Sequence, residues 1–388
     1  MRSTKKITTI VILILFLSSS CFAAIGNEGE RNAEINNDNY EYSDIKEKEI
    51  HLNFSKPEVV PHEDYYIVRV SETNHNSMVL FEKNPGRPVL PVKIKVFNFP
   101  FSTKIEEINY IKGKSTEEDI PGKFSFGKAR NDALLYNKPI NFDNVDESYP
   151  SDWISHKIAG GLNQGEHTTF LILRVYPVVY HQSKNKIEYI QNISINIKYK
   201  TPKQPVVNQK VYDLLIISPS EFENLLDPFV EHKESLGIST KIATVDEIKE
   251  RTYWKGRDIQ EKIKYYIKES ILNWGIKYVL LVGGIEGQTF EWDLPVRYSH
   301  VVPYSEQEYP EKSFISDLYY ADVFDGQANF SSWDSNNDGR FSVWNKSFIE
   351  EMDLYPDVYL GRLPCRNRFE LRAMVNKIIE YEEDKCDE

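Results

Sequence analysis

The sequence predicts two folded parts of different class, an antiparallel β-sandwich over residues 50–200 and a parallel, three-layer α/β part over residues 211–388. In the first part, short alternating or apolar runs are separated by turn residues, and no helical stripe of useful length occurs. In the second, continuous apolar runs alternate with amphipathic helical patterns, which is typical of strands buried on both faces of a parallel sheet. A length of 388 residues is enough for two domains.

The bulk composition limits the possible partners. The chain has 47 basic and 59 acidic side chains and a net charge of −12. This balance argues against a nucleic-acid binder, whose affinity would come from neutralising phosphates. The three cysteines, Cys21, Cys365 and Cys386, form no C-x-x-C pair and allow at most one disulfide bond.

The start of the chain has the three regions of a secretory signal peptide over residues 1–23. Basic residues precede an apolar run over residues 7–17, and small residues lead to a cleavage site that we predict between Ala23 and Ala24. The run is too short for a comfortable membrane span, so we expect no transmembrane span in the mature chain. The sequence therefore predicts a secreted, extracellular protein.

A lipoprotein anchored through Cys21 is the less favoured alternative, because Ser18 stands where a lipobox usually carries leucine.

After the signal, residues 24–49 are rich in Asn, Glu, Asp and Lys and poor in large apolar residues. Such a segment cannot bury enough surface to offset its ordering entropy, so we predict a disordered tether.

Strands of the first part are predicted where alternation or apolar runs are clearest, at residues 65–70, 88–99, 168–180 and 193–199. His156, His167 and His181 lie far apart there, without a Cys or Asp at ligand spacing, and are interpreted as surface or half-buried groups. Residues 201–210 carry prolines and no cap, and we predict a linker accessible to proteases.

The second part begins a strand–helix alternation. Strands are predicted at residues 213–218, 240–245, 278–282 and 358–360, and helices at residues 221–236 and 258–274 and after residue 367. Ser220 with Glu223 has the pattern of a capping box, and Gly237 and Gly275 are expected to end the two earlier helices.

The last strand–helix unit is where function is expected. Gly361 and Pro364 are predicted to stop the strand, and Asn367 with Glu370 to cap the following helix. In such sheets, ligands gather where strands end and helices begin. By contrast, Gly283-Gly284 lacks the lysine and the spacing of a phosphate-binding loop, so a plain strand-end turn is favoured.

A long insertion, about residues 285–353, carries a candidate calcium loop. Asp334, Asn336 and Asp338 supply oxygens at positions 1, 3 and 5, Gly339 permits the sharp turn at position 6, and Arg340 offers a carbonyl at position 7. Dense oxygen ligands of this kind suit a hard cation, so we predict a structural calcium ion. A solvated turn stabilised by the Asp and Asn side chains is the alternative.

The loop lacks its usual final ligand, because position 12 is Asn345 rather than glutamate. Another carboxylate must then complete the site. The sequence offers four candidates without ranking them: Glu350, Glu351, Asp317 and Asp322.

Several segments together resemble one family. Y-D-L-L-I-I-S-P-S-E-F, G-R-D-I-Q-E-K-I-K with Y-V-L-L-V-G-G, S-D-L-Y-Y-A-D and D-V-Y-L-G-R-L-P resemble, in this order, the gingipain-type cysteine peptidases. In the first part, G-R-P-V-L-P-V and Y-I-Q-N-I-S-I-N-I-K-Y are similar to the propeptide of that family. The similarity covers roughly residues 50–382.

This resemblance implies a caspase-like fold, made as a precursor whose β-domain keeps the enzyme latent. It implies cleavage of protein or peptide substrates by a cysteine thiolate that a histidine in a Gly-His-Gly turn assists, since the thiolate is the competent nucleophile.

The sequence departs from the family at the catalytic pair. It contains no Gly-His-Gly, His232 lies within a helical pattern, and His300 lies in the insertion. In the family the pair belongs to a second subdomain that begins after the position matching Glu382, so Cys365 is wrongly placed. We therefore assign no catalytic residue and expect the chain to be inactive by itself.

Two hypotheses remain. The chain is the front portion of a secreted cysteine endopeptidase, with signal peptide, propeptide and first subdomain, whose catalytic half is encoded elsewhere or lost. Alternatively, it is a non-catalytic exported protein, a calcium-binding or inhibitory binding module.

Overall fold

The computed structural model describes residues 40–73, 77–82, 87–127, 148–207, 210–285, 292–301, 313–344, 350 and 352–384. The predicted signal peptide, with its cleavage site at Ala23 and Ala24, lies outside these residues, as does most of the predicted tether. The end of that tether differs from the prediction, because strand β1 begins at Lys46. Its alternate residues Ile50 and Leu52 pair with strand β15, which gives this charged segment a partner.

The first half consists of fifteen strands among the described residues. They are β1 (Lys46–Asn53), β2 (Glu58–His62), β3 (Tyr65–Arg69), β4 (Ser71–Glu72), β5 (Ser77–Met78), β6 (Leu80–Glu82), β7 (Leu90–Pro100), β8 (Lys104–Lys112), β9 (Thr116–Asp119), β10 (Ser148–Tyr149), β11 (Ile154–Asn163), β12 (Glu166–Val175), β13 (Val178–His181), β14 (Lys186–Tyr189) and β15 (Asn192–Lys200).

These strands pair antiparallel, in the orders β1-β15-β8, β11-β12-β7-β6 and β10-β13-β14-β9, with the hairpins β2-β3 and β4-β5. Fully buried residues from different sheets share one core, among them Leu90 on β7, Leu173 on β12 and Ile195 on β15. The run predicted as one strand over residues 168–180 is two strands, β12 and β13, because Pro177 cannot donate to a ladder.

The second half alternates strands and helices. Its elements are β16 (Leu214–Ser218), the 3-10 helix η2 (Ser220–Leu225), α2 (Asp227–Ser235), β17 (Thr240–Thr244), α3 (Val245–Arg251), α4 (Ile259–Trp274), β18 (Tyr278–Val282), β19 (Tyr298–Val301), β20 (Phe314–Ile315), α5 (Leu318–Ala321), β21 (Phe341–Trp344), β22 (Tyr359–Leu363) and α6 (Arg368–Asp384).

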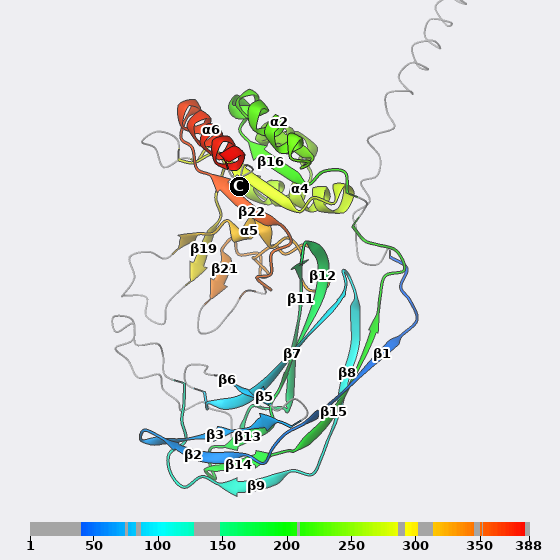
Figure 1. Ribbon diagram of the computed structural model, residues 1–388, viewed down its shortest axis with the longest axis vertical. Coiled ribbons are helices and arrows are strands. Elements are labelled where there is room, and N and C mark those ends of the chain that lie inside the picture. Colours follow the sequence, from blue (N-terminus) through cyan, green and yellow to red (C-terminus); the bar gives the residue numbers. More distant parts are fainter. Residues whose placement is uncertain are drawn as a thin grey trace, which may run out of the picture. The chain divides into compact units, whose positions relative to one another are not determined.

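A four-stranded parallel sheet in the order β17-β16-β18-β22 is the centre of this half. Leu214 and Ile216 of β16 pack with Phe229 of α2 and with Leu371 of α6 in one core. Figure 1 shows α2 and α6 on one side of this sheet and α4 on the other. Antiparallel sheets followed by a parallel sheet are therefore confirmed.

Helix α4 forms as its end signals predict. Asp258 caps it by accepting a hydrogen bond from the Glu261 amide, and Gly275 ends it in the left-handed conformation at φ +66°. The helix predicted over residues 221–236 is instead split into η2 and α2. Pro228 has no amide to donate and fits only in the first turn of a new helix.

Strand β22 is longer than predicted, because Gly361 lies within it and pairs with Leu280 of β18, and Pro364 alone ends it. The following helix has the predicted cap, since the Asn367 Oδ1 atom accepts the amides of Phe369 and Glu370. No helix among the described residues is long and apolar enough to cross a membrane.

Candidate functional site

The four parallel strands end at one edge of the sheet. Ser218 at the end of β16 pairs with Thr244 at the end of β17, and Val282 of β18 pairs with Leu363 of β22. Each strand end leads into a turn or a helix, which is the arrangement that creates ligand sites in parallel sheets. The sequence-predicted position of the functional edge therefore has the expected geometry.

The glycine pair at the end of β18 does not present free amides at this edge. The Gly283 amide donates to the Leu363 carbonyl at 2.9 Å, and the Gly284 amide donates to the Cys365 carbonyl at 2.8 Å. A phosphate-binding loop needs backbone amides that point at the ligand. The geometry is that of the predicted strand-end turn.

Cys365 follows β22 at the same edge, but its side chain is buried. It packs in the core with Phe222, Val282 and Leu371. Burial raises the pKa of its thiol to about 11. A catalytic cysteine needs an environment that lowers the pKa of the thiol, so Cys365 has the properties of a structural residue.

His232 and His300 both have structural partners. The Nε2 atom of His232, on α2, lies 2.8 Å from the Glu382 carboxylate on α6. The Nδ1 atom of His300, on β19, lies 3.4 Å from the Phe341 carbonyl oxygen.

The predicted calcium loop folds around the carboxylate of Asp334. This side chain is buried, and its Oδ1 and Oδ2 atoms accept the amides of Asp338 at 3.0 Å and Gly339 at 3.1 Å. Asn336 and Asp338 are exposed, and the Asp338 carboxylate accepts the Arg340 amide at 2.8 Å. Among the described residues, no three Asp, Glu, His or Cys side chains are gathered so that they could hold a metal.

The structure separates the four candidates for the missing ligand. Asp317 is bound by Arg362, and one oxygen of Asp322 accepts hydrogen bonds from Trp333 and Leu354. Glu351 lies outside the described residues, as does Asn345. Of the three described candidates, only Glu350 has a hydrogen bond to the loop, where its Oε2 atom accepts the Ser335 amide at 2.6 Å.

A group of buried carboxyls lies next to the loop, although the sequence analysis did not single it out as a group. Asp322, Asp353 and Asp357 are each at most 6 % exposed, and burial raises the pKa of all three, to about 7 for Asp353. The pKa of the buried Lys264 falls to about 7, because burial disfavours its charge. This lysine lies over the rings of Tyr319, Phe330 and Trp333.

Two of these carboxyls organise the contact between strand β11 and residues 321–357. The Asp353 Oδ2 atom accepts the Gly160 amide at 2.7 Å, and the Pro356 carbonyl accepts the Leu162 amide at 2.9 Å. Asp357 accepts the amides of Val323 and Phe324, which holds the opposing segment in place. The two halves of the chain are therefore joined through backbone groups.

Close backbone approach explains the glycines at this contact. A Cβ atom on Gly160 would lie 2.8 Å from the Asp325 carbonyl oxygen, and one on Gly161 would lie 3.1 Å from the Pro356 carbonyl oxygen. On the other side, a Cβ atom on Gly326 would overlap the Ile158 carbonyl. A glycine pair inside a strand pattern was the sequence signal for such an approach.

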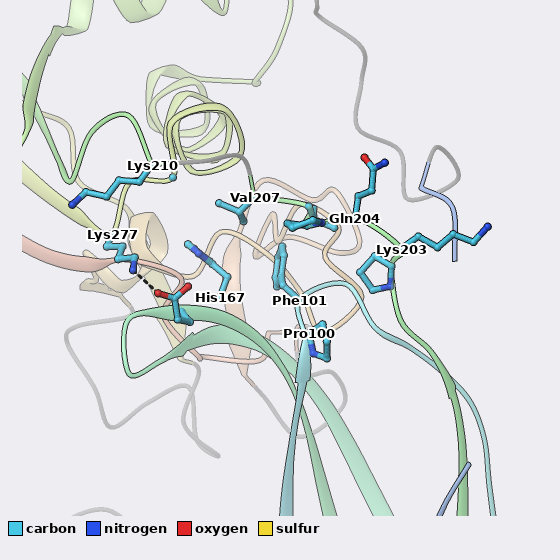
Figure 2. A pocket seen from close by; sticks show the side chains of 13 residues that line it. Pro100, Phe101, His167, Lys203, Gln204, Val207, Lys210 and Lys277 are labelled. Atoms are coloured by element: carbon cyan, nitrogen blue, oxygen red, sulfur yellow. Dashed lines mark hydrogen bonds and ion pairs between the residues drawn. The ribbon is translucent and has the colours of Figure 1, made fainter. Parts of the chain in front are cut away.

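A pocket of about 610 Å³ lies beside this contact, between the β11–β12 hairpin, the predicted linker and Lys277. Figure 2 shows Phe101, His167, Val207 and Lys277 around it, with the ion pair between Lys277 and Glu166. Burial lowers the pKa of His167 to about 4, so the imidazole is neutral near pH 7.

The lysines of this pocket are already paired. Lys210 lies 2.6 Å from Asp213, and Lys203 lies 3.1 Å from Glu41, in addition to the pair of Lys277 with Glu166. Among the residues that the structure describes, no cysteine lines the pocket. The pocket therefore has neither a cysteine nucleophile nor an uncompensated cation for an anionic ligand.

The second half of the chain matches a known protein family. Residues 207–388 match the model of peptidase family C25. No curated protein matches the chain.

Three solved structures from Porphyromonas gingivalis resemble parts of it. The complex of RgpB pro- and mature domains has 10 % identity and a TM-score of 0.29, covering 47 % of this chain and 90 % of that one. A gingipain K structure on zymogenic latency has 13 % identity and a TM-score of 0.28, covering 40 % and 86 %. Dimeric latent PorU has 12 % identity and a TM-score of 0.32, covering 92 % and 39 %.

TM-scores of this size do not establish a shared fold, so the family match carries the assignment. That match begins within the predicted linker and includes the whole parallel sheet, from β16 to β22. Residues 207–388, slightly less than half of this chain, are therefore similar to peptidase family C25.

Proposed function

We propose that this chain is a region of a secreted, gingipain-like cysteine endopeptidase precursor, which cleaves peptide bonds of protein substrates by thiolate attack. Residues 211–388 are the first subdomain of a caspase-like peptidase domain. Residues 50–200 are a propeptide-like β-sandwich that keeps the enzyme latent. The family match of residues 207–388 is the observation that carries this proposal.

The contact between the halves supports a docked, latent precursor. Besides the hydrogen bonds of Gly160 and Leu162, the Lys157 ammonium donates to the Asp353 carbonyl at 3.0 Å. Lys277, just before β18, pairs with Glu166 of the β11–β12 hairpin at 2.7 Å. These contacts are independent of the covalent linker and would hold the β-half in place after its cleavage.

The linker itself is suited to cleavage. Lys203, Gln204 and Pro205 are exposed, whereas Val206 beside them is buried. Exposed tips without regular secondary structure are the preferred sites of proteolytic nicking. Cleavage there would separate the two halves covalently without breaking any strand of either sheet.

Residues 1–388 do not hydrolyse peptides by themselves in this proposal. The thiol of Cys365 is buried with a raised pKa, and thiol attack requires the thiolate. Export through the basic and apolar start of the chain is part of the same proposal and predicts a mature protein that begins at Ala24.

The test inserts the recognition sequence of a site-specific endopeptidase between Gln204 and Pro205 of the full chain. After cleavage, the two fragments are expected to co-elute in size-exclusion chromatography at micromolar concentration, and neither form should hydrolyse a peptide library. A matched chain that also carries Gly326→Ala should release its fragments, because that methyl group disrupts the contact.

Two results would overturn the proposal. If the fragments of the cleaved chain without Gly326→Ala separate at once, the two halves are not docked and the latent precursor is refuted. Peptide hydrolysis that disappears with Cys365→Ala would make Cys365 the nucleophile and refute the assigned inactivity.

A further inference from the structure

The contact between the two halves of the chain has an aromatic centre. Phe101, in the turn between β7 and β8, packs on Phe324 of the insertion, with ring centroids 5.2 Å apart and the rings at 72°. Phe170 of β12 packs on Tyr355 of the second half at 5.4 Å. Phe101, Phe170 and Phe324 are buried. The halves therefore meet through apolar side chains as well as through backbone hydrogen bonds.

His167 belongs to this contact. It lies on β12 opposite Leu162 of β11, whose amide donates to the Pro356 carbonyl of the second half. Its ring packs against Phe101, with centroids 5.7 Å apart. Figure 2 shows its side chain among those that line the pocket, together with Phe101 and Lys277. The first half thus brings a titratable ring to the apolar surface that it shares with the second half.

The surroundings of the imidazole suit its neutral form. His167 is half-buried as a residue, but its Nε2 atom is buried and has no hydrogen-bond partner among the described residues. Burial lowers the pKa of the imidazole to about 4 and outweighs the Asp357 backbone and the Glu166 charge, which favour protonation, whereas Lys277 opposes it. A protonated ring donates from both nitrogens, so the second N–H would have no acceptor here.

The other charged groups nearby do not change this balance. Glu166 is paired with Lys277 at 2.7 Å. The remaining charged residues that line the pocket, Lys203 and Lys210, are cations and cannot stabilise an imidazolium. The carboxylate of Asp357 accepts two backbone amides of the insertion. A proton on His167 therefore has little to compensate it while the halves are docked.

We propose that His167 makes the contact between the two halves sensitive to acid, so that protonation of its imidazole weakens the docking of the β-half. A charged imidazole needs water or an acceptor at Nε2, and separation of the β11–β12 hairpin from the second half gives water access to that atom. This regulation rests on the proposed latent precursor and adds the condition under which its two halves come apart.

The direction of the pH effect follows from the two pKa values. The imidazole titrates at 6.5 when it is freely exposed and at about 4 in the docked chain. Separated halves therefore bind a proton that the docked chain excludes. The contribution of His167 to docking is complete above pH 6.5 and is lost as the pH falls toward 4. At pH 5 we expect this loss to weaken the contact by at least about tenfold.

Asp353 at the same contact titrates in the opposite direction, so a test must isolate His167. The pKa of Asp353 is raised by burial and by the Asp322 charge, while the Gly160 amide and the Lys157 ammonium of β11 oppose the shift. A substitution of His167 leaves all of these groups in place. The ratio of the docking affinities of variant and wild type at each pH therefore cancels the contribution of Asp353.

The experiment uses the full chain cleaved between Gln204 and Pro205, with and without His167→Asn. Asparagine keeps a polar amide at this position but cannot become charged. Analytical ultracentrifugation of a dilution series gives the dissociation constant of the two fragments at pH 7.5 and at pH 5. The wild-type constant divided by the variant constant is expected to rise at least about tenfold between pH 7.5 and pH 5. His167→Gln is the second variant, should asparagine disturb the hairpin.

The matched control is His156→Asn. His156 is exposed on β11 of the same hairpin, so its loss should leave the dissociation constant at the wild-type value at both pH values. If the two variants of His167 show the same ratio to the wild type at pH 7.5 and pH 5, the role of His167 is refuted and the docked precursor stands.

Fragments that separate at both pH values would instead refute the docked precursor, and the uncut chain then decides the role of His167. In the uncut chain, acidification from pH 7.5 to pH 5 should lower the urea midpoint of the wild type more than that of His167→Asn, because the same contact buries the imidazole. An equal decrease in both chains would overturn the proposal.

Discussion

The guanidinium of Arg362 and the carboxylate of Asp317 form a bidentate ion pair, with the Nε–Oδ2 distance at 2.7 Å and the Nη2–Oδ1 distance at 2.8 Å. Arg362 lies on β22, and Asp317 lies in the insertion just before α5. The remaining hydrogens of the guanidinium go to the carbonyls of Gly283, Leu294 and Pro295. One arginine therefore joins the edge of the parallel sheet to the end of β18 and to two segments of the insertion.

We expect Arg362→Lys to lower the free energy of unfolding by about 3 kcal/mol, because an ammonium cannot reach the carboxylate and three carbonyls together. Urea denaturation followed by tryptophan fluorescence measures the change. Arg366→Lys is the control, since its pair with Glu370 is exposed and its loss should be undetectable. Equal stability of both variants would mean that the Arg362 contacts are not important for the fold.

The contact between β11 and the insertion predicts a second effect. In Gly326→Ala the new methyl group overlaps the backbone of Ile158 and Ala159, which cannot move aside as a flexible side chain would. We expect the free energy of unfolding to fall by about 1–3 kcal/mol. Hydrogen exchange should also become faster at the amides of Gly160 and Leu162, which donate across the contact.

Gly361→Ala is the matched control for this substitution. Its Cβ atom would have no neighbour closer than 3.8 Å, the distance to the Leu280 Cδ1 atom. Its stability and its exchange rates should stay near the wild-type values. Unchanged protection of Gly160 and Leu162 in Gly326→Ala would show that the two segments do not approach as closely as described.

Elements of the second half were predictable where burial and end signals agree. Strand β18 has the predicted bounds, and α4 begins after its Asp258 cap and ends at Gly275, because every local signal points the same way. The split at Pro228 was missed because the apolar pattern continues across it. Strand β8 was missed because its residues are largely exposed and charged, and β15 supplies the pairing that its sequence does not announce.

The sequence predicted some parts of the candidate sites and missed others. The turn at Asp334 was predictable because its hydrogen bonds are local: the Asp334 contacts to the Asp338 and Gly339 amides follow from residue spacing. Glu350 reaches the turn because its backbone amide pairs with Val343 of β21, which is a tertiary contact. No local sequence pattern therefore ranks it above Asp317 or Asp322. Arg362 was seen only as part of a turn motif, since its partners come from three distant segments.

The reactivity of Cys365 tests its assignment as a core residue. A pKa of about 11 leaves almost no thiolate at pH 8, and the side chain is fully buried. Iodoacetamide should therefore modify Cys365 far more slowly in the folded chain than in 6 M urea. Peptide mass spectrometry separates this residue from Cys21 and Cys386, and equally fast modification in both conditions would contradict the burial.

The carboxyl of Asp353 should make the stability of the chain depend on pH. Its pKa is raised from 3.8 to about 7, by burial first and by the nearby Asp322 charge second. The folded state therefore holds this proton more tightly than the unfolded state, so its contribution to stability is complete below pH 4 and is lost as pH rises through 7. Lys157 opposes the shift, and Lys264 titrates near the same pH with the opposite sign.

Asp353→Asn isolates this contribution. The amide keeps one oxygen for the Gly160 or Tyr355 amide and cannot ionise, so the variant should lose stability at pH 5 and recover about 2 kcal/mol relative to the wild type at pH 8. Urea denaturation at the two pH values measures the difference, with Asp325→Asn, at a half-buried position, as control. A stability difference that is the same at pH 5 and pH 8 would show that Asp353 is already ionised in the folded chain, and the hydrogen bond to Gly160 would then be one to a carboxylate.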